Sequence, residues 1–160
     1  MRVKDLMTKQ VSTVRAGEPS STALRLMWDC DCGSLPVLDG DGKVIAVVTD
    51  RDIAMTALFR DAWPSALPVS EAMSKKILCC SPDDSVSAAE HIMREHQIRR
   101  LPVLDLEGRL VGVLSMADIA RTAAERGHQK EVAPEEVTDL IADVCSPRRA
   151  RKSTYAGKEH

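Results

Sequence analysis

The stretch Leu35-Pro36-Val37-Leu38-Asp39 returns unchanged as Leu101-Pro102-Val103-Leu104-Asp105, 66 positions further along the chain. At this offset residues 3–57 align with residues 69–123 without a gap, and the three residues from Asp52 match those from Asp118. Self-similarity at a fixed offset over such a length indicates an internal duplication. The 160-residue chain is therefore two copies of one structural unit.

Both copies predict the same order of elements. Two β-rich runs separated by an Asp/Gly turn indicate a hairpin, and the residues before and after the hairpin have helical periodicity. The predicted extended pieces and hairpin strands are Val11–Val14, Leu35–Leu38 and Val44–Val48 in the first copy, and Ile77–Cys80, Leu101–Leu104 and Leu110–Leu114 in the second. The closing helices are predicted at Arg51–Phe59 and Ala117–Arg126. The stripes of the preceding helices are Ala23, Leu26, Met27 and Cys30, and Val86, Ala89, Met93 and His96.

The fold class expected is α/β in the α+β sense, with two repeats packed by pseudo-twofold symmetry through their small β-sheets. Units of this size are marginal alone, so we expect them to share one core. A helix is also predicted at Pro134–Cys145, and its apolar stripe must dock somewhere because a lone helix of this length is marginal in water. It could pack on the two repeats of its own chain or on a partner subunit. The predicted division is 1–58 (repeat 1), 59–68 (linker), 69–126 (repeat 2), 127–147 (C-terminal docking helix region) and 148–160 (a basic tail, expected to be flexible).

The composition excludes several functional classes. The chain has 22 Lys and Arg against 24 Asp and Glu, and only four aromatic residues, which argues against a nucleic-acid binder. No apolar run approaches the length that spans a bilayer, and no signal peptide is apparent, so we expect a cytoplasmic protein without a membrane partner. No recurring Ser/His/Asp or Cys/His set suggests a nucleophile, and the length leaves no room for a catalytic domain. We therefore expect a protein that is not an enzyme.

A hydroxyl and a carboxylate recur where each closing helix begins, as Thr49-x-x-Asp52 and Ser115-x-x-Asp118. The pattern approximates a capping box, in which the side chains satisfy the first backbone N–H groups of the helix. It equally suits a ligand, because a helix N-terminus attracts phosphate and an Asp accepts hydrogen bonds from ribose hydroxyls. The residues themselves leave both interpretations open.

The ordered motifs resemble the cystathionine-β-synthase (CBS) domain, and the tandem resembles a complete CBS pair, or Bateman module. The motifs are the opening Val-x-x-x-Met, the Leu-Pro-Val-Leu-Asp strand, a Gly-x-hydrophobic run, and the closing Thr49–Ile53 and Ser115–Ile119 segments. In detail the chain is similar to small stand-alone two-CBS proteins of bacteria. The resemblance implies a homodimeric, non-catalytic regulatory module that needs no cofactor. It would bind an adenosine-containing ligand between the repeats and signal to a separate effector protein.

The resemblance also implies which residues contact the ligand. The Ser/Thr-x-x-Asp motifs would hold ribose and phosphates, and the adenine would lie between the early β segment and the Leu-Pro-Val strand. Arg51 offers a charge for phosphate in the first copy, whereas Ala117 occupies this position in the second. The implied residues are Thr13, Val14, Ser34, Leu35, Val37, Thr49, Arg51 and Asp52, with Cys79, Cys80, Arg100, Leu101, Val103, Ser115 and Asp118.

Two alternatives remain beside this interpretation. One is a ligand-independent dimeric stress-response or interaction protein, whose dimer surface and C-terminal helix carry the function. The other is a thiol or zinc redox switch built on Cys30, Cys32, Cys79 and Cys80. Four thiolates would suit tetrahedral zinc, but neither pair has the usual C-x₂₋₄-C spacing. Buried structural thiols are therefore favoured, and no metal is expected.

Overall fold

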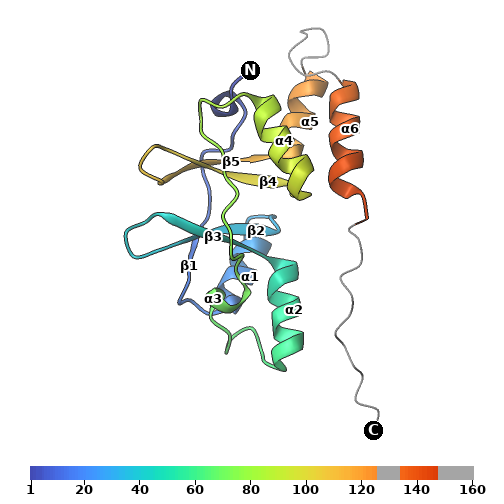
Figure 1. Ribbon diagram of the computed structural model, residues 1–160. Coiled ribbons are helices and arrows are strands. Elements are labelled where there is room, and N and C mark those ends of the chain that lie inside the picture. The colour runs from blue at the N-terminus through green and yellow to red at the C-terminus, as the bar shows by residue number, and fades with distance from the viewer. Residues whose placement is uncertain (126–133, 148–160) are drawn as a thin grey trace.

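The computed structural model describes residues 1–125 and 134–147, and the predicted basic tail at 148–160 lies outside them. Two α/β halves stand one above the other, with their sheets adjacent in the middle and their helices toward the outside (Figure 1). The elements are η1 (Val3–Asp5), β1 (Val14–Arg15), α1 (Ser20–Asp29), β2 (Ser34–Leu38), β3 (Val44–Thr49), α2 (Asp50–Arg60), α3 (Val69–Ala72), α4 (Val86–His96), β4 (Arg100–Leu104), β5 (Leu110–Ser115), α5 (Met116–Glu125) and α6 (Pro134–Cys145).

The two hairpins have the same register. Strand β2 pairs antiparallel with β3, β4 pairs antiparallel with β5, and each ladder has its irregularity at the equivalent place. Gly42 and Gly108 turn the two hairpins with positive φ angles of 81° and 78°, which glycine adopts without steric cost. Between the halves, Lys43 and Arg109 form an antiparallel bridge, so the two hairpins meet near their turns.

The buried side chains form two clusters, which corrects the expectation of one shared core. One cluster joins Val14, Ala23 and Ile53 of the first repeat, and the other joins Met93 and Leu101 of the second. Each cluster is completed by the leading segment of the opposite repeat. The exchanged residues are Val3 in the second cluster, and Val69 and Ala72 in the first.

Backbone hydrogen bonds hold the exchanged segments at matching positions. Val3 N–H donates to the carbonyl of Asp84 (3.0 Å), and 66 residues later Val69 N–H donates to the carbonyl of Glu18 (2.9 Å). Because each half needs a segment from the other, the units of packing differ from the units of sequence repetition. This exchange ties the two halves together through the backbone.

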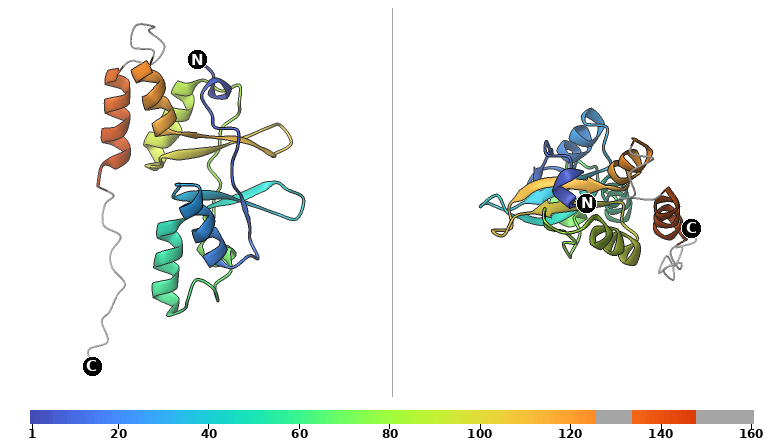
Figure 2. Two further views of the ribbon diagram at one scale, coloured as in Figure 1. Left: turned by 180° about the vertical axis from the view of Figure 1, so that it is seen from behind. Right: turned by 90° about the horizontal axis from the view of Figure 1, so that it is seen from above.

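Helix α6 lies against α4 and α5 on the outer side of the second half (Figure 2). Its residues Val137, Leu140 and Val144 are buried in the second cluster. Burying an aliphatic side chain stabilises a fold by about 1.5–3 kcal/mol, which accounts for the docking of so short a helix. Of the two docking sites that the sequence leaves open, the chain itself and a partner subunit, the structure has the helix on its own chain.

The predicted strands and closing helices begin and end within one or two residues of the observed ones, apart from the early extended pieces. Of those, the structure has the two-residue β1 and a single bridge at Cys80. The helical stripes are buried through Met27 and Met93, but Cys30 and His96, predicted to continue them, are exposed. Both lie at the ends of their helices, beyond the strands that cover the preceding turns.

Candidate functional site

In the first repeat, the junction between β3 and α2 forms a helix cap. Thr49 Oγ1 accepts a hydrogen bond from Asp52 N–H (3.1 Å) and donates to Asp52 Oδ2 (2.6 Å). Asp50 Oδ1 accepts from Arg51 N–H (2.6 Å), and Asp50 N–H donates to the Gly33 carbonyl (3.3 Å). The side chains of this first turn therefore satisfy the N–H groups that a helix start leaves without intrahelical partners.

In the second repeat, the equivalent junction is more deeply buried. Ser115 Oγ donates to Asp118 Oδ2 (2.6 Å), which also accepts from Ser115 N–H (2.9 Å), and Asp118 Oδ1 pairs with Arg121. Asp118 is buried, whereas its counterpart Asp52 is exposed. Met116 N–H donates to the Arg99 carbonyl (3.0 Å). Met116 has no carboxylate to cap the next N–H as Asp50 does, so Ala117 N–H remains available at this helix start.

An open hollow of about 510 Å³ lies beside this second junction. It is bounded by both repeats and by the C-terminal helix. Its lining residues are Gly33, Arg99, Arg100, Ser115, Met116, Ala117, Ala120, Ile141 and Cys145.

The hollow combines positive charge with apolar surface. Arg99 is exposed and Arg100 half-buried, and both stand beside the positively polarised start of α5. A Cβ at Gly33 would come within 3.2 Å of Asp50 Oδ2 and 3.8 Å of Arg100 Nη1, so glycine keeps space open where these groups converge. The hollow is therefore suited to an anion attached to an apolar body.

A family model described as the CBS domain matches residues 3–57 and 69–125. The chain belongs to the CBS-domain family. Hypoxic response protein 1 of Mycobacterium tuberculosis is 31% identical over 144 residues, which cover 90% of this chain and 94% of that protein. The family resemblance stated from the motifs is thus confirmed.

Two solved structures of CBS-domain pairs share the fold. The crystal structure of Hypoxic Response Protein I with two coordinated zinc ions has a TM-score of 0.68 at 33% identity, covering 76% of this chain and 98% of that one. The CBS-domain pair of protein MJ0100, in complex with 5′-methylthioadenosine and S-adenosyl-L-methionine, has a TM-score of 0.71 at 25% identity. It covers 79% of this chain and 98% of that one.

Only part of the predicted site lies at the hollow. Arg100 and Ser115 line it, and Asp118 stands behind Ser115 through their hydrogen bond. Thr49, Arg51 and the remaining polar residues of the first repeat lie outside its lining. The predicted apolar contact residues are buried in the two cores, so mainly their backbone atoms can meet a ligand. These residues are Val14, Leu35, Val37, Cys80, Leu101 and Val103. Thr13, Ser34 and Cys79 are half-buried.

The lining residues from α6 were not among the predicted site residues. Ile141 and Cys145 lie beyond both repeats, and the sequence signals only that their helix has an apolar stripe. Ala120 is likewise an ordinary helix residue with no binding signature. Which part of the body α6 covers is a tertiary property, so sequence periodicity alone could not place these residues at the site.

The cysteine side chains differ in their surroundings. All five are free of disulfides, and Cys32 packs on the first core while Cys80 belongs to the second. Burial raises the pKa of Cys80 to about 12, with smaller contributions from the charges of Asp84 and Cys79. Burial also raises the pKa of Cys79. In residues 1–125 and 134–147 no three metal-ligating side chains gather, and no helix in those ranges is long and apolar enough to cross a membrane.

Proposed function

We propose that this protein is a non-catalytic regulatory module that binds an adenosine-containing ligand between its CBS repeats and signals to a partner protein. The ligand is AMP, ADP, ATP or a similar compound, held in the hollow of the second repeat. The observation that carries this proposal is the convergence of Arg99, Arg100 and the α5 N-terminus on one hollow that also has apolar walls.

Each part of such a ligand has a chemical counterpart in the hollow. The two guanidinium groups and Ala117 N–H are donors suited to phosphate oxygens. Ser115 Oγ and the Asp118 carboxylate offer hydrogen bonds to ribose hydroxyls, in exchange for part of their present contact with each other. The side chains of Met116 and Ala120 supply apolar surface for the base.

The MJ0100 structure supports an adenosyl ligand in a CBS pair, and the charge of this hollow favours one particular class. The two compounds named for MJ0100 carry no phosphate. Here two arginines line the hollow. Of the nearby carboxylates, Asp118 is paired with Arg121, and Asp50 Oδ2 lies close to Arg100 beside Gly33. Because the arginines favour an anionic ligand, we propose nucleotides with at least one phosphate as the preferred ligands.

A thermal-shift panel with AMP, ADP, ATP, 5′-methylthioadenosine and S-adenosyl-L-methionine tests the proposal. A nucleotide at a hundred times its Kd should raise the Tm by about 5 °C or more, because binding to the folded state alone stabilises it. Asp118→Ala should reduce this shift, and the matched variant Asp52→Ala should leave it largely intact. No shift with any compound at millimolar concentration contradicts the proposal.

A second candidate function rests on large apolar side chains that are exposed on α1 and α2 of the first repeat, here called the α1–α2 face. Trp28 of α1 and Leu58 and Phe59 of α2 are exposed by 87%, 67% and 66%. Large exposed apolar side chains are a feature of interaction sites. We propose a ligand-independent dimeric interaction protein as the alternative, with this face as the homodimer contact and a role in stress response, as the name of the mycobacterial relative suggests.

The dimer contact can be tested separately from ligand binding. The two helices also carry exposed residues of both charges, Arg25 and Asp29 on α1 and Arg60, which pairs with Glu71, on α2, so two copies can meet with opposite charges paired. Leu58→Asp should convert a dimer to a monomer in sedimentation equilibrium while preserving any nucleotide-induced thermal shift. A wild-type monomer at micromolar concentration contradicts the homodimer.

A further inference from the structure

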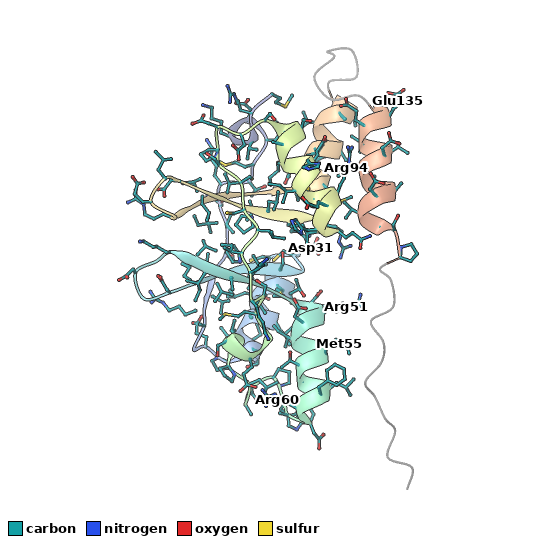
Figure 3. All side chains as sticks on the ribbon, in the orientation of Figure 1. Asp31, Arg51, Met55, Arg60, Arg94 and Glu135 are labelled. Atoms are coloured by element: carbon teal, nitrogen blue, oxygen red, sulfur yellow. The ribbon has the colours of Figure 1, made fainter. Side chains whose placement is uncertain are left out.

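Helix α6 is attached to the second repeat by apolar and polar contacts. Leu140 is completely buried between α4 and α5. Arg94 of α4 donates from Nη2 to the Glu136 carbonyl (3.1 Å), and its Nε lies 3.7 Å from Asp143 Oδ2. In Figure 3, Arg94 lies beside α6. These contacts fix the helix along its length and so determine which residues it presents at the hollow.

The C-terminal end of α6 is held beside the hollow by Gln97. This residue ends α4 with a left-handed backbone, and its Nε2 donates to the carbonyls of Ser146 (3.1 Å) and Asp143 (3.4 Å). Carbonyls at a helix C-terminus lack intrahelical donors, so the amide of Gln97 satisfies groups that would otherwise need water. The last turn of α6 is thereby positioned against the same half that supplies the α5 N-terminus.

Two α6 side chains face the hollow instead of the core. Ile141 remains 44% exposed and Cys145 is exposed, although their neighbours Leu140 and Val144 are buried. A large aliphatic side chain at the wall of a hollow that also holds two arginines is suited to cover the apolar part of a bound ligand. The repeat-1 counterparts of Arg94 and Gln97 are Trp28 and Asp31, so this means of attaching a helix belongs to the second repeat.

We propose that α6 is the outer wall of the nucleotide site, and that ligand occupancy and α6 docking are linked. This inference rests on the proposed nucleotide-binding function. A nucleotide in the hollow contacts Ile141 and Cys145 only when α6 is docked, so it stabilises the docked helix. By reciprocity, anything that holds α6 in place raises the affinity for the nucleotide. The extent to which α6 is docked then depends on whether the second site is occupied.

Alkylation of Cys145 by N-ethylmaleimide, resolved by peptide mass spectrometry in the full-length protein, tests this directly. AMP at ten times its Kd should slow alkylation of Cys145 about tenfold, because only the unoccupied fraction reacts. Cys30, exposed on the first repeat, is the internal control and should react at an unchanged rate. If AMP raises the Tm but alkylation of Cys145 is unaffected, the α6 wall is wrong while nucleotide binding stands. If AMP does neither, both proposals fail.

A pair of variants checks the same wall without chemical modification. Ile141→Trp places a larger side chain in the hollow and should reduce the AMP-induced Tm shift by more than half. Asp139→Trp makes the same bulky replacement on an exposed position of α6 that does not line the hollow. Its AMP-induced shift should equal that of the wild type. Equal shifts in both variants contradict the proposed wall.

Discussion

The α1–α2 half and the α4–α5 half have the same order of helix, hairpin and helix, but their outer surfaces differ. On α5, Ala120 and Ala123 pack in the cluster that α6 completes, and the alanines at positions 117 and 124 are exposed. The equivalent positions of α2 are Arg51, Ala54, Ala57 and Leu58, and Arg51 and Met55 extend from α2 on the side away from the sheets (Figure 3). After duplication, a few substitutions on one helix pair thus determine whether it accepts a further helix.

Other substitutions make the two strand-to-helix junctions unequal. Met55 in the first repeat corresponds to Arg121, which pairs with the buried Asp118. Asp50, which caps a backbone N–H in the first repeat, corresponds to Met116 at the hollow. Duplication therefore conserved the strands and the caps, and an arginine-lined hollow lies beside the second junction. The following variants test how far that inequality extends.

The largest expected effect contrasts one substitution on the covered and the uncovered face. Leu140→Ala removes a completely buried side chain of α6 and should lower the free energy of unfolding by about 2–5 kcal/mol. Leu58→Ala, on the exposed face of α2, should change it by less than about 0.5 kcal/mol in the monomer. Urea unfolding monitored by circular dichroism measures both. Equal effects would show that α6 is not docked in solution.

The next contrast concerns the two caps. Asp118→Ala leaves Ser115 and Arg121 without their buried partner and should lower the free energy of unfolding by about 2 kcal/mol. Asp52→Ala removes an exposed cap and should cost less than about 1 kcal/mol. The two variants are compared by urea unfolding at one pH. A larger loss for Asp52→Ala would reverse the proposed ranking of the junctions.

Arginine substitutions sharpen the same comparison at the level of binding. Arg100→Ala should weaken AMP binding about tenfold, because a charge-assisted hydrogen bond contributes about 1.5–3 kcal/mol. Arg51→Ala, at the junction of the first repeat, should change the Kd by less than about twofold, within ordinary variation for a site it does not touch. Calorimetric Kd values decide between them, and a tenfold loss with Arg51→Ala would place the nucleotide at the first junction.

The smallest effect concerns Glu90, a buried carboxylate of α4 whose counterpart in α1 is Leu24. Burial raises the pKa of Glu90 above its ordinary 4.5, and Glu136 of α6 adds to this while Arg94 opposes it. A raised pKa in the folded state stabilises the protein below the unfolded value, and this stability is lost as the pH rises through the folded pKa. Glu90→Gln should therefore flatten the decline of unfolding free energy above pH 4.5.

Urea unfolding between pH 4.5 and 7.5 measures that decline. The control Glu135→Gln changes an exposed carboxylate of α6 and should retain the slope of the wild type. At pH 7 Glu90→Gln should be more stable than the wild type by about 1 kcal/mol, because it removes a negative charge that is unfavourable to bury. An unchanged slope in Glu90→Gln would show that this carboxylate is solvated in the folded protein.

Local chemistry made much of the fold predictable from the sequence. The hairpins were marked by β-rich runs on either side of Asp/Gly turns, and α6 by its apolar stripe after Pro134. The exchange of Val3 and Val69 between the two cores was not predictable, because it depends on contacts between residues far apart in the chain. The repeat boundaries do not show this exchange, because the two leading segments match each other in sequence.

The candidate site was predictable only where a motif marks it. Ser115 and Asp118 were identified because hydroxyl and carboxylate recur at helix starts, and Arg100 through the family resemblance. Ile141 carries no such mark, because any amphipathic helix has apolar residues and only docking decides which of them meet the hollow. The sequence shows a difference between the two junctions, because Arg51 in the first repeat corresponds to Ala117 in the second. The effect of this difference on the binding site depends on where α6 packs.

Titration calorimetry of the wild-type protein with AMP tests the central claim most directly, because it counts the sites. A nucleotide held by the arginine-lined hollow of the second repeat should bind with a stoichiometry of one per chain. Asp118→Ala should weaken that binding, whereas Asp52→Ala should leave it unchanged. Two equivalent sites per chain, or one site that is lost in Asp52→Ala and retained in Asp118→Ala, would contradict the account.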